Sequence, residues 1–188
     1  MSIETYSDHE AVKGLAHPDR LFIGGDWVPA SSGRVVEIVN PDTEAVVGTV
    51  AEGDERDMDK AVAAARLAFD EGPWPRMSPA ERQAVLRRMC EYLRTREPEI
   101  ARAWNLQMGG LMSFAPMLSS VGTETFIYIT EMMGDYPFVE RVPSRFADTG
   151  IIAREPVGVV AAIAPWNGPY AIMGTKLVNA LAAGCTVI

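Results

Sequence analysis

An uninterrupted apolar run near the carboxyl end of the chain restricts the possible folds more than any other feature of the sequence. Residues Val157 to Ile163 lack the alternation of polar and apolar side chains that marks a half-exposed strand. Such a run is typical of a parallel strand that is fully buried because both of its faces are covered. It continues into Pro165-Trp166-Asn167, which brings the polar amide of Asn167 to the carboxyl end of the strand. Because ligands bind at that end of parallel strands, we expect a ligand site there.

A helix and a second strand are expected after this run. Residues Ala171 to Ala182 are rich in Ala and Leu, and Gly184 stands where such a helix would end. Cys185 to Ile188 then begins the next strand. Strand, helix and strand in this order predict a parallel crossover unit.

Short antiparallel strands are expected in two other places. Residues 21–28 predict two strands around a Gly-rich turn, and residues 35–39 and 45–50 predict two more. These four contain no cluster of titratable residues, so we expect a small antiparallel β layer that serves as scaffold. Residues 138–142 and 151–154 predict a further pair of strands joined by a polar loop.

Helical signals dominate the middle of the chain. Met58, Val62, Ala65 and Phe69 recur at helical spacing and define a single apolar face. Residues 78–81, Ser-Pro-Ala-Glu, carry the signals of a helix start. The serine hydroxyl can accept from a free backbone N–H, the proline suits the first helical position, and the glutamate can reach back to the cap.

Prolines and glycines set the expected limits of the next helices. We expect a new helix to open at Pro98 and to end at Gly109-Gly110. Ser113 to Met133 then predicts another helix, rich in Met and aromatic residues. Core packing explains this stripe of large side chains better than a ligand-binding surface does.

Composition and charge exclude several classes of protein. The formal net charge of −8 argues against a nucleic-acid surface, which requires clustered Lys and Arg. Arg82, Arg87, Arg88, Arg94 and Arg96 do cluster, and a solvated helix face explains them better than a phosphate site. No signal peptide is evident, and the longest uncharged apolar stretch is about half of the roughly 20 residues that a membrane helix needs. The sequence predicts a soluble cytoplasmic protein that binds neither nucleic acid nor membrane.

Cysteine and histidine are too sparse to indicate a disulfide framework or a metal site. Cys90 and Cys185 are the two cysteines of the chain, which fits a reducing compartment. His9 and His17 lie in the polar amino-terminal segment without an evident partner, so no metal is expected.

An ordered set of short motifs gives the chain a family resemblance. Pro165-Trp166-Asn167 is followed by Lys176 on a helix and then by residues 180–187, Ala-Leu-Ala-Ala-Gly-Cys-Thr-Val. In this order and spacing the motifs resemble the aldehyde dehydrogenase superfamily. Segments upstream of these motifs also agree with the family in order and spacing, so that the resemblance extends over about residues 21–188. The upstream segments are residues 21–28, 40–41, 51–53, the Ala-rich helix through Phe69, Trp74, 78–82 and 154–158.

The resemblance implies a fold, a reaction and partners. The fold would be α/β, the amino-terminal part of a Rossmann-type cofactor domain with a small antiparallel β layer and an oligomerisation-type hairpin. The reaction would be the oxidation of a small-molecule aldehyde to a carboxylic acid with NAD or NADP as cofactor, by a protein that forms homo-oligomers. The implied division is a polar tail at 1–20, the β layer and helices of the cofactor domain at 21–137, the hairpin at 138–156, and the start of the parallel core at 157–188.

The same resemblance assigns a role to Asn167. Addition of a thiolate to an aldehyde turns the carbonyl oxygen into an anion, and Asn167 matches the amide that donates to it. The residues by themselves leave an alternative open, because Asn is also a preferred cap for the helix expected to begin near Pro169.

Five further residues receive roles from the resemblance. Four of them match the wall around the nicotinamide end of NAD(P), with ordinary strand-end packing as the alternative; they are Ile163, Ala164, Pro165 and Trp166. Lys176 matches a lysine that takes part in proton handling, since a desolvated Lys can have a lowered pKa. A surface lysine is an equally good interpretation of that position.

The chain also departs from the family pattern. Residues 103–111 lack the acidic residue and the Gly-Lys pair that are usual there, and Cys185 replaces a common Asn. In the family the nucleophilic cysteine and the general-base glutamate lie downstream of the position matching Asn167. Neither Cys90 nor Cys185 has the electropositive, accessible surroundings that a reactive thiolate requires.

Two alternative functions remain open at this stage. The chain could be a catalytically inactive fragment or an interaction module without nucleophile and base, in which case we expect weak stability and self-association. It could also be an unrelated α/β binding protein with a local resemblance, which the agreement upstream disfavours.

Overall fold

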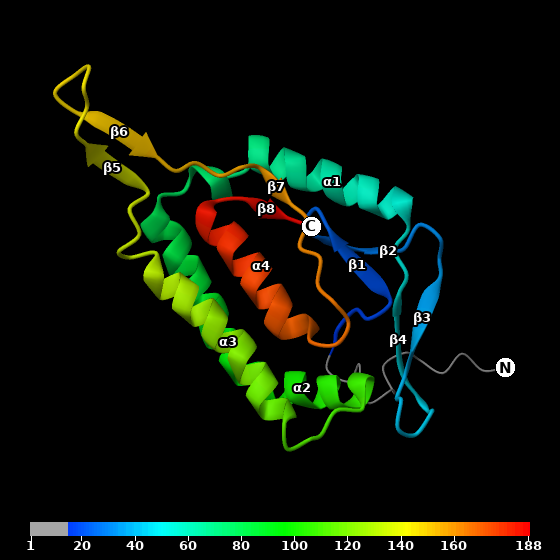
Figure 1. The fold of residues 1–188 in the computed structure, drawn as a ribbon. Coiled ribbons are helices and arrows are strands. Elements are labelled where there is room, and N and C mark those ends of the chain that lie inside the picture. The colour runs from blue at the N-terminus through cyan, green and yellow to red at the C-terminus, as the bar shows by residue number, and fades with distance from the viewer. Residues whose placement is uncertain (1–14) are drawn as a thin grey trace.

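Two antiparallel hairpins open the part of the chain that the structure describes, residues 15–188 of a computed structural model (Figure 1). Strand β1 (Arg20–Ile23) pairs with β2 (Asp26–Pro29), and β3 (Val35–Val39) pairs with β4 (Val46–Ala51). The four expected strands are confirmed, and they form two separate two-stranded sheets. Most of the expected polar tail, including His9, lies outside the described residues.

Helix α1 (Glu55–Asp70) follows the second hairpin and begins with a capping box formed by Asp54 and Asp57. The helix is confirmed, but its apolar face is only partly buried. Ala65 is buried, whereas Met58 and Val62 are 55% and 43% exposed. The reason is that α1 lies at the margin of the described fold, where its main contacts are with β1, β7, β8 and the short helix that follows it (Figure 1).

Helix α2 (Pro79–Met108) follows a short 3₁₀ helix (Trp74–Arg76) and corrects one expectation. It begins with the expected Ser78–Glu81 capping box and ends at Gly109, which adopts the left-handed conformation with φ 64°. Pro98, however, lies inside this helix and does not open a new one. A proline there costs roughly 3 kcal/mol. Helix α2 packs against α3, and the burial of Cys90 before Pro98 and of Ala101 after it offsets that cost.

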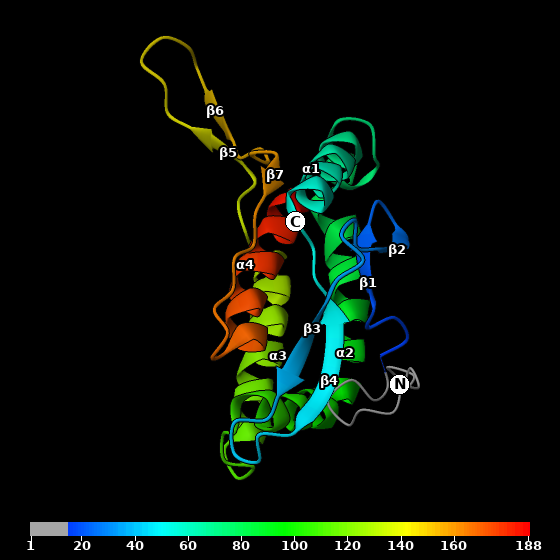
Figure 2. The same ribbon diagram turned by 90° about the vertical axis from the view of Figure 1, so that its right-hand side faces the viewer.

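Helix α3 (Ala115–Met132) is confirmed and lies beside α2 and α4 (Pro169–Ala183) in one helical layer (Figure 2). Two small groups of buried side chains form the core of this layer. One combines Leu86 and Ala182 with Met133, and the other combines Cys90, Phe126 and Val178, from α2, α3 and α4 respectively. Phe126 and Met133 thus belong to the core, whereas Met117 and Tyr128 are 49% and 68% exposed, so core packing of this stripe is confirmed only in part.

The arginines of α2 do not all lie on a solvated face. Arg87 and Arg94 form exposed ion pairs with Glu131 and Glu124 of α3. Arg82, by contrast, is 5% exposed and donates to the backbone carbonyl oxygens of Met77 and Ala182. The last carbonyls of a helix lack intrahelical partners, so the guanidinium satisfies the end of α4. Burial lowers the pKa of Arg82 from its ordinary value.

The antiparallel pair expected at residues 138–142 and 151–154 is confirmed, with its bounds shifted by one residue. Strand β5 (Val139–Val142) pairs antiparallel with β6 (Gly150–Ala153). The pair projects away from the helical layer (Figures 1 and 2), and Phe146 in its connecting loop is 99% exposed.

The apolar run that follows forms a shorter and more exposed strand than expected. Strand β7 covers only Val159–Val160, and Val157 and Ile163 are 88% and 78% exposed. The expectation of a fully buried strand is therefore wrong. Within residues 15–188, β7 pairs with β8 alone, and α1 is the one helix that packs closely on it. An apolar sequence is buried only where neighbouring elements cover it.

The crossover unit itself is confirmed. Strand β8 (Thr186–Val187) runs parallel to β7, with Val159 opposite Thr186, and α4 connects them. Helix α4 ends at Gly184, which adopts φ 95°. Within residues 15–188, none of the helices combines the length and the hydropathy that crossing a bilayer would require.

Candidate functional site

The loop between β7 and α4 carries five of the six candidate residues. Residues 161–168 leave the carboxyl end of the parallel strand and turn into the first residue of α4, Pro169. Ile163 and Trp166 are 78% and 77% exposed, Pro165 is exposed, and Ala164 is half-buried. The strand end therefore presents an apolar surface to solvent. Within residues 15–188, Ile163 and Trp166 are not packed into a core.

Asn167 follows this apolar surface, and its side chain is exposed. Among residues 15–188 no hydrogen-bond partner exists for its side-chain amide. The cap residue of α4 is Gly168, and no side chain caps that helix. The alternative that Asn167 serves as a helix cap is thus wrong. The amide is available to a ligand.

Contacts from two other helices fix the start of α4. The Trp104 indole of α2 donates from Nε1 to the backbone carbonyl oxygen of Asn167 over 2.9 Å. The Tyr170 hydroxyl lies 2.9 Å from Thr123 Oγ1 of α3, and the Tyr170 ring stacks near Phe126 with centroids 6.5 Å apart. Burial raises the pKa of Tyr170, which keeps the phenol neutral. No sequence pattern signals these contacts, because Trp104 is 63 residues away from Asn167.

Lys176 stands apart from this loop. It is exposed on α4. It lies seven positions after Pro169 on the helix, or about 10 Å along the axis. Among the described residues its ammonium group has no ion-pair or hydrogen-bond partner, so the structure does not bring Lys176 and Asn167 together.

The cysteines lie away from the loop and are buried. The Cys90 thiol is 3.6 Å from Thr130 Oγ1, and burial raises its pKa. Cys185 is 2% exposed at the start of β8. A reactive thiol requires access and a lowered pKa, so Cys90 does not act as the nucleophile, and buried Cys185 lacks access, as expected. In the described part of the chain no group of His, Cys, Asp and Glu could hold a metal ion. His17 instead packs its ring on Trp27.

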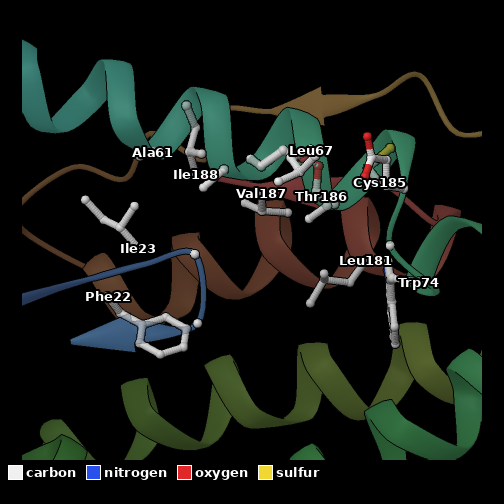
Figure 3. Close-up of a pocket in the computed structure, with 17 residues that line it drawn as sticks. Phe22, Ile23, Ala61, Leu67, Trp74, Leu181, Cys185, Thr186, Val187 and Ile188 are labelled. Carbon is white, nitrogen blue, oxygen red and sulfur yellow. Dashed lines mark hydrogen bonds between the residues drawn. The ribbon is translucent and has the colours of Figure 1, made fainter. Parts of the chain in front are cut away.

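A separate apolar groove of about 640 Å³ lies between α1, the β1–β2 turn and β8 (Figure 3). Phe22 and Ile23 lie on one side, Ala61 and Leu67 of α1 line another, and Leu181 lies toward the helical layer. Neither Asn167 nor the exposed apolar residues before it contribute to this groove. The sequence does not predict this groove, because the elements that form it are distant along the chain.

Comparison with known proteins decides the family. The model of the aldehyde dehydrogenase family matches residues 27–188. The chain belongs to the aldehyde dehydrogenase family. It is 40% identical over 171 residues to aldehyde dehydrogenase 1 of Tanacetum cinerariifolium, an alignment that covers 90% of this chain and 34% of that relative. It is 36% identical over 174 residues to an NADP/NAD-dependent aldehyde dehydrogenase of Escherichia coli, covering 93% of this chain and 35% of that relative.

Solved aldehyde dehydrogenase structures resemble the fold closely. Betaine aldehyde dehydrogenase of Staphylococcus aureus, in complex with NAD⁺, superposes with a TM-score of 0.88 at 31% identity, covering 97% of this chain and 36% of that one. An aldehyde dehydrogenase of Mycobacterium tuberculosis complexed with NAD⁺ gives a TM-score of 0.85 at 36% identity, covering 90% of this chain and 35% of that one. The expected α/β class, part of the aldehyde dehydrogenase fold, is confirmed. The chain spans about a third of the length of these relatives.

Proposed function

We propose that the protein to which this chain contributes oxidises an aldehyde to a carboxylic acid with NAD or NADP, and that Asn167 stabilises the oxyanion formed on the way. The observation that carries the proposal is the exposed amide of Asn167 at the carboxyl end of a parallel strand, without a partner among the described residues. Family membership supplies the reaction class.

The proposed chemistry at Asn167 follows from charge development. When a cysteine thiolate adds to an aldehyde, the carbonyl oxygen gains negative charge and becomes part of a thiohemiacetal. An amide N–H that already points into the site stabilises this charge without reorganisation of solvent. Asn167 fits this task because its side chain makes no competing hydrogen bond within residues 15–188, while its backbone is held by Trp104.

The residues before Asn167 fit the nicotinamide end of the cofactor. The cofactor, when bound, accepts a hydride from the substrate carbon. Ile163, Pro165 and Trp166 present exposed apolar side chains, and the side chain of Ala164 is half-buried. Such a surface can pack against one face of a flat ring and exclude water from it. Family membership alone supports a lesser role of Lys176 in proton transfer, because its side chain is exposed and stands apart from the loop.

The hairpin β5–β6 is proposed to mediate self-association into a homo-oligomer. Val139 and Ile151 are 67% and 69% exposed on strands whose outer edges are unpaired among the described residues. Unpaired apolar edges favour pairing with another chain. In this assignment residues 21–137 and 157–188 belong to the cofactor domain, and residues 138–156 serve assembly.

Replacement of Asn167 by Ala in the full-length protein tests the proposed function. Loss of one oxyanion donor lowers turnover by about 100- to 1,000-fold, so kcat is expected to fall by that factor at unchanged KM for NAD(P). Asn179→Ala is the matched control, since Asn179 is an exposed asparagine of α4 that bonds only to its own helix. Unchanged kcat in a folded Asn167→Ala protein contradicts the proposal.

A further inference from the structure

We infer that Trp104 is a positioning residue for Asn167, and that its indole N–H determines where the Asn167 amide stands. The inference rests on the proposed function of Asn167. It concerns a segment, residues 103–111, in which the sequence departs from the family pattern.

The contact between the two residues is direct. Trp104 Nε1 donates to the Asn167 carbonyl oxygen over 2.9 Å, a normal length for such a hydrogen bond. The carbonyl and the side chain of Asn167 share one Cα atom, so restraint of the carbonyl also restrains the origin of the side chain. Because the side-chain amide has no partner of its own within residues 15–188, this backbone contact is its nearest anchor.

The Trp104 ring is itself held in place by its surroundings. Gly110 lies against the ring so closely that an added Cβ would stand 1.9 Å from a ring carbon. Phe114 packs on it at a centroid distance of 6.2 Å. Behind the ring, a hollow of about 20 Å³ between Leu118, Tyr170 and their neighbours leaves room for about one water molecule. The ring therefore has little freedom to move away from the loop.

Tyr170 provides a second fixed point, on the carboxyl-terminal side of the loop. This second point does not replace the contact that Trp104 makes with Asn167. Tyr170 is fixed by Thr123 and Phe126, but it lies beyond Gly168 and Pro169. The Gly168 carbonyl oxygen accepts from Ile172 N, but Gly168 has no side chain and no side chain caps α4, so the chain can pivot on the amino-terminal side of Gly168. Rigidity at Tyr170 consequently does not extend to Asn167. The indole N–H of Trp104 supplies it.

The hydrogen bond is tested first in the chain itself by NMR. The Trp104 indole N–H is expected to exchange with solvent at least tenfold more slowly than that of Trp166, which is exposed and unpartnered among the described residues. Gly110→Ala, which displaces the ring, is expected to abolish most of this difference. Equal exchange rates of Trp104 and Trp166 in the unaltered chain would overturn the inference.

The functional role is tested by turnover of the full-length protein. Trp104→Phe keeps a ring and removes the donor, and is expected to lower kcat about three- to tenfold at unchanged KM for NAD(P), the effect of one hydrogen bond. Trp74→Phe is the matched control, because Trp74 Nε1 is buried without a hydrogen-bond partner in the described structure. It is expected to leave kcat unchanged.

A double-mutant cycle separates positioning from a general structural role. If Trp104 acts through Asn167, Trp104→Phe has no further effect on kcat in an Asn167→Ala background. Independent, multiplicative losses overturn the inference while leaving the proposed function intact. An Asn167→Ala protein with full activity overturns both, so the two failures are distinguishable.

Discussion

The helical layer of α2, α3 and α4 and the β-rich side of the molecule are held together by different interactions. In the helical layer, Leu86 is almost completely buried in one group of apolar side chains, and Phe126 and Val178 are almost completely buried in the other. On the β-rich side, α1 and the strands bury few large apolar side chains. Single polar contacts link them, such as the hydrogen bond from Thr186 Oγ1 of β8 to Ala65 O of α1.

A second polar contact on the β-rich side joins the β2–β3 loop to α1. Ser31 donates to the buried Asp57 carboxylate through both its backbone N–H and its hydroxyl, and Lys60 donates to the Ser31 hydroxyl. Polar contacts of this kind orient elements but contribute less free energy than dense apolar packing does. We therefore expect the free energy of unfolding to depend mainly on the helical layer.

The largest expected effect comes from Phe126, which is 1% exposed in the helical layer. Phe126→Ala removes a buried ring and leaves a cavity, so the free energy of unfolding should fall by about 3 to 5 kcal/mol. Urea denaturation measures the change. Phe146→Ala is the control, because that ring is 99% exposed. Similar losses for both rings would contradict the comparison.

A smaller effect is expected at Arg82, which connects the start of α2 to the end of α4. Arg82→Met leaves the carbonyl oxygens of Ala182 and Met77 without this donor, and should cost about 2 kcal/mol in the free energy of unfolding. The exposed Arg88, which bonds only to the carbonyl of Ala84 in its own helix, provides the control variant Arg88→Met. A stabilised Arg82→Met protein would show that the cost of burying the charge exceeds the value of its hydrogen bonds.

Thr186→Val tests one polar contact of the β-rich side by itself. The substitution preserves shape and removes the hydroxyl that bonds to Ala65, so a loss of about 1 kcal/mol is expected. Thr175→Val is the counterpart on α4, where the hydroxyl bonds to Ile172 of the same helix. The two effects are compared by chemical denaturation. A loss at Thr186 as large as that at Phe126 would remove the distinction between the two regions.

The last effect is confined to acid pH and concerns Asp57. The hydrogen bond from the Ser31 hydroxyl lowers the pKa of this carboxyl from 3.8 to about 2. A carboxyl whose pKa is lower in the folded than in the unfolded state stabilises the fold above the unfolded pKa. That contribution is lost as pH falls from about 4 to about 2. Thermal unfolding of Asp57→Asn should therefore show a weaker dependence on pH in this window than thermal unfolding of the unaltered protein.

Local signals predicted most of the elements because each depends on neighbouring residues. The Ser78–Glu81 capping box and the left-handed glycines at 109 and 184 act within one turn of helix, and they stand where the sequence indicated. Pro98 was misjudged because its cost is local while the compensating packing against α3 is not. Val157 and Ile163 were misjudged for the same reason, since burial depends on elements that are distant along the chain.

The candidate site likewise has features that the sequence predicts and features that depend on contacts between distant segments. The order of strand, apolar turn, Asn167 and helix follows from the sequence, because backbone connectivity alone places the amide at the carboxyl end of β7. That Asn167 does not cap α4, and that Trp104 holds its carbonyl, depend on the meeting of helices α2 and α4. Hydrogen bonds and packing between segments 63 residues apart leave no periodic signal in a sequence. The sequence by itself thus determined which elements form and which family the chain resembles. The tertiary structure decided which side chains are buried and which are exposed, and it placed Trp104 against the backbone of Asn167.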